Sequence, residues 1–95
     1  NTGWYVFGTK SELKGQRILD GDRVLQGAFN KSYFTKIDIR ITKEIKLYSK
    51  SARLLTAHPS SSYSLSADTN GQYVLRITDP QTFWSTSKYL VIQVK

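Results

Sequence analysis

Two short, almost uninterrupted apolar runs near opposite ends of the sequence constrain its fold more than any other feature. The first is GWYVFG at residues 3–8, and the second is YLVIQV at residues 89–94. Each run is too short for a typical helix and is rich in strand-forming residues, which predicts a strand buried on both faces. The simplest architecture pairs these two strands, or sets them side by side, at the centre of a mixed sheet.

Short alternating stretches of apolar and polar residues fill the region between these runs. In residues 34–41 the three isoleucines fall on one face and the charged residues on the other, which is the pattern of a half-exposed strand. Residues 44–48 and 53–57 continue this pattern. Asn70-Gly71 separates two further alternating runs and is the strongest hairpin signal in the chain. Asp20-Gly21-Asp22 predicts a second, looser hairpin.

Two segments have the sequence pattern of a helix N-terminus. Thr9 followed by Glu12 forms a capping box, and it predicts a short helix that runs to about Lys14 and ends at Gly15. Asp79 followed by Pro80 predicts a single helical turn over residues 80–84, because proline at the first helical position loses no hydrogen bond.

These elements together predict a mostly-β α+β fold, with a mixed or antiparallel sheet of about seven strands and one or two short helices. The chain of 95 residues has the size of one domain, and it contains neither a repeat nor a low-complexity linker. We therefore expect residues 1–95 to form a single β-rich module. Its core is expected to include Trp4, Phe7, Trp84 and Tyr89.

Composition excludes several classes of function. The absence of cysteine rules out a disulfide framework, a thiolate nucleophile and a zinc–thiolate site. No apolar run approaches the roughly 20 residues that span a bilayer. The sequence starts at Asn1 and has no methionine, which favours a processed fragment or a piece of a longer protein.

The chain is basic, with 14 Lys and Arg against 7 Asp and Glu and a net charge of +7. Such an excess suits nucleic acid, an anionic glycan or lipid headgroups. It also keeps a small domain soluble. The basic residues are spread along the chain and never form a run of three, which favours the second explanation.

The residue types that carry catalysis or bind metals are sparse. His58 is the only histidine, and its position before Pro59 indicates a turn residue rather than a base or a ligand. Asp20 and Asp22 share a turn, and Glu12 serves a helix cap. No serine-nucleophile or phosphate-binding motif is present. We expect no catalytic residue, no metal site, no cofactor and no small-molecule substrate.

The strongest candidates for ligand contact are aromatic residues next to cations. Tyr33, Phe34 and Tyr48 are expected to be exposed, and Arg40 and Lys46 lie near them in the predicted strands. Amphipathic rings beside cations are typical of protein and glycan contact patches. Nucleic-acid binding is disfavoured, because the chain has no RNA-recognition motif and most rings are assigned to the core.

Four segments in order resemble a known family: YVFGTKSEL (5–13), YFTKID (33–38), AHPSSSY (57–63) and FWSTSKYLVI (83–92). Together they resemble the C-terminal domain of Bacteroides-type surface lipoproteins, some of which are labelled collagen-binding adhesins. The resemblance covers nearly the whole chain. Members of that family have a lipidated N-terminus and a coiled-coil stalk before this globular end.

The resemblance implies a C-terminal domain at the outer face of a Gram-negative cell envelope, attached to the membrane only through an upstream anchor. It implies a non-catalytic adhesive role with an extracellular protein, such as collagen, or a glycan as partner. Two alternatives stay open. In the first, the module binds an anionic polymer electrostatically, and this polymer is nucleic acid or an acidic glycan. In the second, the module is a purely structural cap of a stalk.

Overall fold

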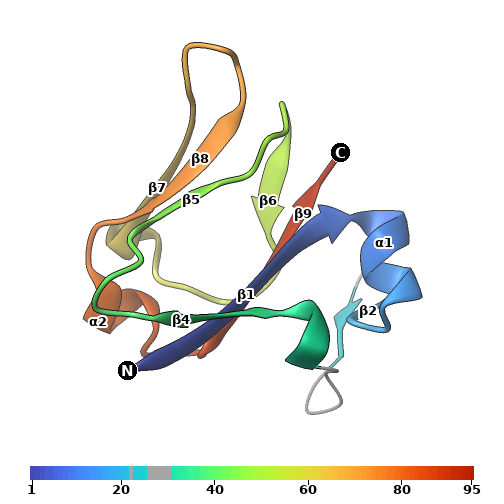
Figure 1. Ribbon diagram of the computed structural model, residues 1–95, viewed down its shortest axis with the longest axis horizontal. Helices are drawn as coiled ribbons and strands as arrows, with labels where there is room; N and C mark the ends of the chain where they lie inside the picture. The colour runs from blue at the N-terminus through green and yellow to red at the C-terminus, as the bar shows by residue number, and fades with distance from the viewer. Residues whose placement is uncertain (22, 26–30) are drawn as a thin grey trace.

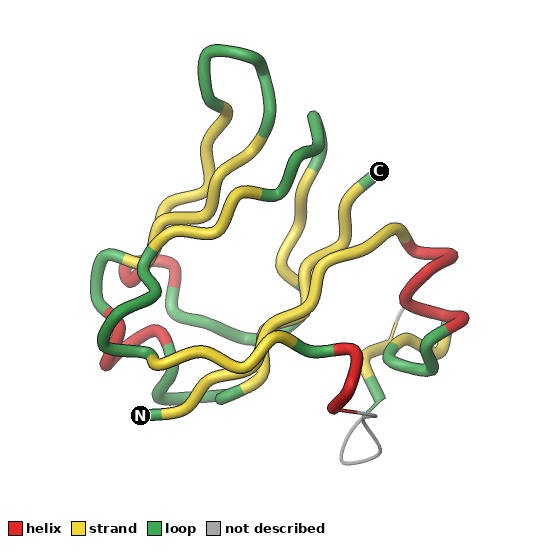
Figure 2. The backbone as a smooth tube through the Cα atoms, in the orientation of Figure 1, coloured by secondary structure: helices red, strands yellow, loops and turns green. Residues whose placement is uncertain are grey.

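The computed structural model describes residues 1–21, 23–25 and 31–95. This part of the chain measures 31 × 29 × 21 Å. It has a mostly-β α+β fold with short helices, as the sequence predicts (Figures 1 and 2). The strands divide among three sheets instead of joining in one.

The elements follow one another in the chain with short connections. The strands are β1 (Thr2–Thr9), β2 (Leu19–Asp20), β3 (Arg23–Val24), β4 (Thr35–Asp38), β5 (Glu44–Lys46), β6 (Ala52–Leu54), β7 (Tyr63–Ala67), β8 (Tyr73–Ile77) and β9 (Tyr89–Val94). The helices are α1 (Lys10–Gly15) and α2 (Pro80–Phe83), with single 3-10 turns η1 (Lys31–Tyr33) and η2 (Ser60–Ser62).

The first and last strands pair in parallel at the centre of a four-stranded sheet of order β4-β1-β9-β6. The register runs from Trp4 opposite Tyr89 to Thr9 opposite Val94. β4 and β6 add to the outer sides in antiparallel orientation. The predicted central pairing of the two apolar runs is therefore confirmed.

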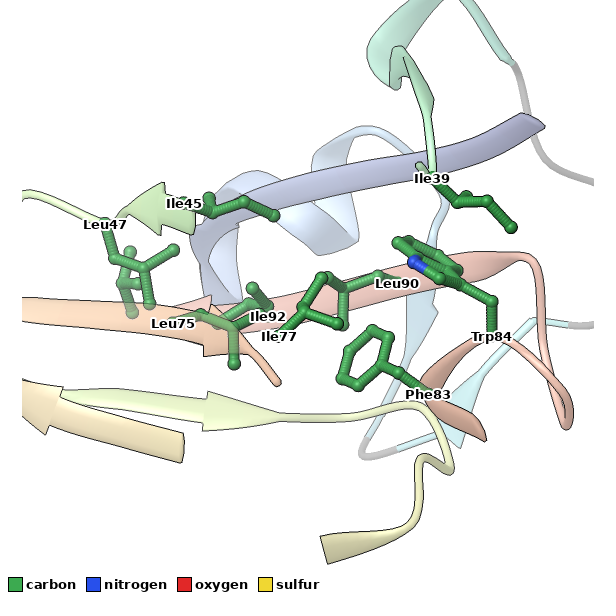
Figure 3. Close-up of a cluster of buried hydrophobic side chains, with 10 residues drawn as sticks. Ile39, Ile45, Leu47, Leu75, Ile77, Phe83, Trp84, Leu90 and Ile92 are labelled. Atoms are coloured by element: carbon green, nitrogen blue, oxygen red, sulfur yellow. The ribbon is translucent and has the colours of Figure 1, made fainter. Parts of the chain in front are cut away.

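The main core lies between this sheet and a three-stranded sheet of order β5-β8-β7 (Figure 1). In the close-up, Leu90 and Ile92 of β9 and Leu75 and Ile77 of β8 lie in one cluster with Phe83 and Trp84 (Figure 3). The other buried members of this cluster are Ile39, Ile45, Leu47 and Val94. The tight β7–β8 hairpin forms at the predicted turn, where Gly71 has a φ of +79°.

Trp84 is fully buried at the end of α2. Asp79 caps this helix by accepting hydrogen bonds from the Thr82 N–H at 3.3 Å and its hydroxyl at 2.7 Å. The Trp84 Nε1 is buried without a hydrogen-bond partner in the described part of the chain, at a cost of about 1–3 kcal/mol. Burial of the ring outweighs this cost, because about 200 Å² at 25 cal/mol per Å² stabilises by ~5 kcal/mol.

Helix α1 covers the second face of the four-stranded sheet, where Leu13 and Ile18 pack with Val6 and Val91. The capping box forms as predicted, with Thr9 N to Glu12 Oε1 at 2.8 Å and Glu12 N to Thr9 Oγ1 at 3.1 Å. The helix ends at Gly15, as predicted, but Gly15 is not the residue in the left-handed conformation.

The residues after Gly15 form a Schellman motif at the end of α1. Arg17, with a φ of +60°, donates from its N–H to Lys14 O, and Ile18 N donates to Leu13 O. Because Leu13 and Ile18 are both fully buried, their contact stabilises this end. A non-glycine residue therefore takes the left-handed position.

Strand β4 is shorter than the predicted strand over residues 34–41. The Asp38 side chain accepts from the Arg40 N–H at 2.9 Å and binds the Arg40 guanidinium at 3.0 and 2.8 Å. Ile41 N and Thr42 N both donate to Asp38 O, which turns the chain. Such a local turn competes with the ladder, and it leaves Ile41 76% exposed instead of facing inward.

The predicted hairpin over residues 18–25 is present as the antiparallel pair β2–β3, with Gly21 at a φ of +62°. Asp22, which shares that predicted turn, lies outside the described residues.

Two glycines provide a matched test of close packing. A Cβ at Gly3 would lie 2.9 Å from Ile39 Cγ2 and 3.1 Å from Trp84 Cη2, whereas a Cβ at Gly15 would meet nothing within 4 Å. We expect Gly3→Ala to lower the free energy of unfolding by about 1–3 kcal/mol. Gly15→Ala should leave it unchanged or raise it. Urea denaturation of both variants measures the difference, and equal stabilities would contradict the packing of Trp84 on β1.

Removal of the buried indole tests the core itself. Trp84→Ala should lower the free energy of unfolding by about 3–5 kcal/mol through lost packing and a cavity. The control is Ile41→Ala, which removes an exposed side chain and should stay within about 0.5 kcal/mol of the parent. A Trp84→Ala variant as stable as the Ile41→Ala variant would show that the core is placed wrongly.

Candidate binding surface

The structure does not gather the five predicted contact residues into one patch. Tyr33 and Tyr48 are 45% and 70% exposed, as expected, but Phe34 is only 7% exposed. The expectation that Phe34 is exposed is therefore wrong. The turn η1, which carries Tyr33, and the loop after β5, which carries Tyr48, lie on opposite sides of the view in Figure 1.

Phe34 is buried because α1 covers the face of the sheet on which it lies. Its ring packs with Val6 and Val91 and lies nearly perpendicular to the ring of Tyr89, at 82° and 5.7 Å between centroids. In the sequence, Phe34 alternates in phase with Lys36 and Asp38, which indicates a charged outer face. In the structure, the Phe34 end of that face is covered by α1, whereas the Lys36 end is exposed.

Arg40 and Lys46 come from different parts of the fold. The Arg40 guanidinium is held by the Asp38 carboxylate, and this hydrogen bonding lowers the pKa of Asp38 to about 2 and raises the pKa of Arg40. Arg40 is thus engaged in a local turn. Lys46 is exposed on β5, in the other sheet.

A different set of rings and cations meets at the open end of the sheet face. Trp4 of β1 lies opposite Lys36 of β4 on one side and opposite Tyr89 of β9 on the other. Residues opposite one another on neighbouring strands project from the same face. The Trp4 and Tyr89 rings are nearly parallel, at 18° and 6.5 Å between centroids. We call Lys36, Trp4, Tyr89 and the adjacent Lys31 the ring–lysine row.

Both lysines of this row lie over aromatic rings. The Lys31 Nζ is 5.3 Å from the Trp4 ring centroid and 6.0 Å from that of Tyr89, and the Lys36 Nζ is 5.7 Å from that of Trp4. An exposed cation–π contact of this kind is worth about 0.5–1 kcal/mol. Neither lysine takes part in a salt bridge within the described ranges. The nearby Asp38 carboxylate is bound by Arg40, so it does not neutralise them.

The sequence places Trp4 and Tyr89 in the core, whereas the structure leaves both half-buried. The prediction that both faces of β1 and β9 are buried is wrong at this end. The sequence contained part of this information, because alternation places Trp4 and Val6 on one face of β1 and Tyr5 and Phe7 on the other. Alternation does not show which face a helix will cover, or how much of its length.

A hollow of about 390 Å³ lies beside the Tyr89 end of the row. Its wall is uncharged, with three hydroxyl and three apolar side chains, from Val24, Leu55, Thr56, Ala57, Thr86 and Ser87. Ser87 connects it to the row, since its Oγ donates to Tyr89 O at 2.8 Å and accepts from Tyr89 N at 3.1 Å.

A cleft of about 500 Å³ at Asn1, Ile39, Arg40, Lys43 and the start of α2 is a weaker candidate. Two of its charged groups already serve local structure, because Arg40 binds Asp38 and Asp79 caps α2. The cleft has no paired aromatic rings beside its remaining charged side chain, Lys43.

His58 joins three elements rather than forming a reactive site. Its ring stacks on Phe83 at 4.1 Å between centroids. The Phe83 carbonyl, 2.8 Å from Nδ1, only accepts, so Nδ1 carries the proton and Nε2 accepts from the Thr56 hydroxyl at 2.8 Å. Thr56 Oγ1 in turn accepts from Val91 N at 3.2 Å. Burial lowers the pKa of His58, which keeps the ring neutral.

Within residues 1–21, 23–25 and 31–95, no three acidic or histidine side chains gather in a group that could hold a metal ion. None of the helices in these ranges has the length and apolar character needed to cross a membrane. No protein-family model matches the chain, and neither curated proteins nor solved structures yield a match.

The lowered pKa of His58 predicts how stability depends on pH. Below the ordinary histidine pKa of 6.5, His58 is protonated in the unfolded chain but stays neutral in the folded chain until the pH is lower. Stability should therefore be full above that pH and fall between about pH 6.5 and 5. Thermal midpoints at pH 7.5 and 5 measure the change.

His58→Gln serves as the control, because it removes the only histidine. The carboxylates with shifted pKa values titrate below this window, since their pKa values are lowered. A parent protein whose thermal midpoint changes no more than that of His58→Gln would contradict the buried, neutral ring.

Proposed function

We propose that this chain is a non-catalytic binding module of a bacterial cell-surface lipoprotein, with the ring–lysine row as its contact surface. The observation that carries the proposal is the half-exposed pair of Trp4 and Tyr89 on adjacent strands, with two lysine ammonium groups above them. Tyr and Trp beside cations dominate the energy of many binding interfaces. A row across three strands offers a shallow, extended contact.

The engagement of the titratable groups supports a non-catalytic role. His58 is held between Thr56 and Phe83, Glu12 and Asp79 cap helices, and Asp38 binds Arg40. Each of these groups therefore has a structural task.

An extracellular protein such as collagen is the first ligand class to test. Collagen presents an extended triple helix with exposed proline rings and charged side chains. The rings of Trp4 and Tyr89 suit proline, and Lys31 and Lys36 suit acidic side chains. The cell-surface location, the upstream anchor and collagen itself rest on the family resemblance of the sequence.

An anionic polymer is a second candidate, favoured by the positions of Lys31 and Lys36 over the Trp4 ring and by the net charge of +7. Salt separates the two candidates. Binding of a polyanion through counterion release falls steeply as salt rises, whereas contact through buried rings weakens far less.

A binding measurement with immobilised collagen at about 0.15 M salt tests the first ligand class. We expect the parent protein to bind, and Trp4→Ala to bind at least about tenfold more weakly, the loss typical of an interface hot spot. Tyr48→Ala is the control, because Tyr48 is exposed outside the row. Circular dichroism and thermal midpoints check that each variant folds.

Two results would count against the proposal. If Tyr48→Ala loses as much affinity as Trp4→Ala, the row is not the contact surface. If the parent binds neither collagen nor a polyanion at any salt, a structural cap of a stalk becomes the better explanation.

A further inference from the structure

We propose that the ring–lysine row and the hollow beside it form a binding site for an acidic glycan, a sugar chain that carries sulfate or carboxylate groups. This inference rests on the proposed function, because it assigns a ligand class to the same surface. It differs from the collagen proposal in its ligand and in its dependence on salt.

The anionic groups of such a chain fit the lysine end of the row. The Lys31 and Lys36 ammonium groups lie over one indole, at 5.3 and 5.7 Å from its centroid. By these distances the two ammonium groups lie no more than about 11 Å apart, so adjacent anionic groups of one polymer can reach both. A lysine ammonium is a flexible point charge with three donors, which suits the compact oxygens of a sulfate or carboxylate.

The neutral end of the row suits the sugar itself. The hollow of about 390 Å³ has no charged residue in its wall and presents hydroxyls from Thr56, Thr86 and Ser87 beside apolar side chains. Sugars likewise offer hydroxyls on their edges and C–H groups on their faces. The row crosses β4, β1 and β9, which at the usual strand spacing is roughly 10 Å, and the hollow extends this surface beyond Tyr89. That length fits a short stretch of a polymer rather than a single small molecule.

Single-stranded nucleic acid fits the same surface less well. Its bases gain affinity by stacking on open aromatic faces. Here the lysine ammonium groups already lie over the Trp4 ring, and the Phe34 ring lies nearly perpendicular to the Tyr89 ring at 5.7 Å between centroids. A base must displace the lysines from the indole to stack on it, which costs the cation–π contacts. An anionic group on a glycan binds the lysines where they are.

The test compares two double variants that remove the same charge. Lys31→Gln with Lys36→Gln takes two cations from the row, whereas Lys46→Gln with Lys50→Gln takes two exposed cations from β5 and the loop after it. A heparin oligosaccharide is the probe, and an oligothymidylate of equal charge and uncharged dextran are the comparisons. Affinities are measured by calorimetry at about 0.05 and 0.15 M salt.

We expect heparin to bind the parent protein and to bind the Lys31/Lys36 variant about tenfold more weakly, as for paired charges removed from an interface. The Lys46/Lys50 variant should lose no more than about threefold, through long-range charge alone. Dextran should not bind. Thermal midpoints confirm that both variants fold.

Three results would overturn the proposal. Equal losses in the two double variants would show diffuse attraction to a basic protein. Tighter binding of oligothymidylate than of heparin, lost in Trp4→Leu, would assign the row to nucleic acid. Absence of heparin binding at both salt concentrations would remove the site. Collagen binding by a protein that ignores heparin would leave the proposed function standing and reject this inference alone.

Discussion

The parallel pairing of β1 and β9 is the constraint on which the rest of the structure depends. These strands hold the two most apolar runs of the chain at its centre, and each of their faces needs a cover. The three-stranded sheet and α2 cover one face, and α1 with the β2–β3 hairpin covers part of the other. Parallel strands require a long connection, and the described part of that connection contains both covers as well as the outer strands β4 and β6.

The same pairing creates the ring–lysine row. Trp4, Lys36 and Tyr89 are distant in sequence, and only the registers of β1 with β4 and with β9 place them in one line. Helix α1 is only six residues long; the cluster under it buries Val6 and Val91, whereas Trp4 and Tyr89 pack at its edge and stay only partly buried. The half-exposed rings are a consequence of a short helix on a longer sheet. The lysines are held above them by the attraction of a cation to an aromatic face.

Most polar side chains that suit catalysis are engaged in holding local structure. Glu12, Asp38 and Asp79 have pKa values lowered by their hydrogen bonds, and His58 has its pKa lowered by burial. All four shifts follow from caps, turns or packing that the fold needs. The lysines of the row have no such engagement with an acid in the described ranges, which is why the proposed contact surface centres on them.

The sequence by itself determined the local elements: the capping box at Thr9, the Asp79-Pro80 helix start, the Asn70-Gly71 hairpin and the two central strands. Each depends on contacts between near neighbours or on an uninterrupted apolar run. It did not determine which face of a strand is covered, so Phe34 is buried instead of exposed and Trp4 is only half-buried. The tertiary structure decided this, because alternation separates the two faces of a strand, while burial depends on how far a distant element reaches across them.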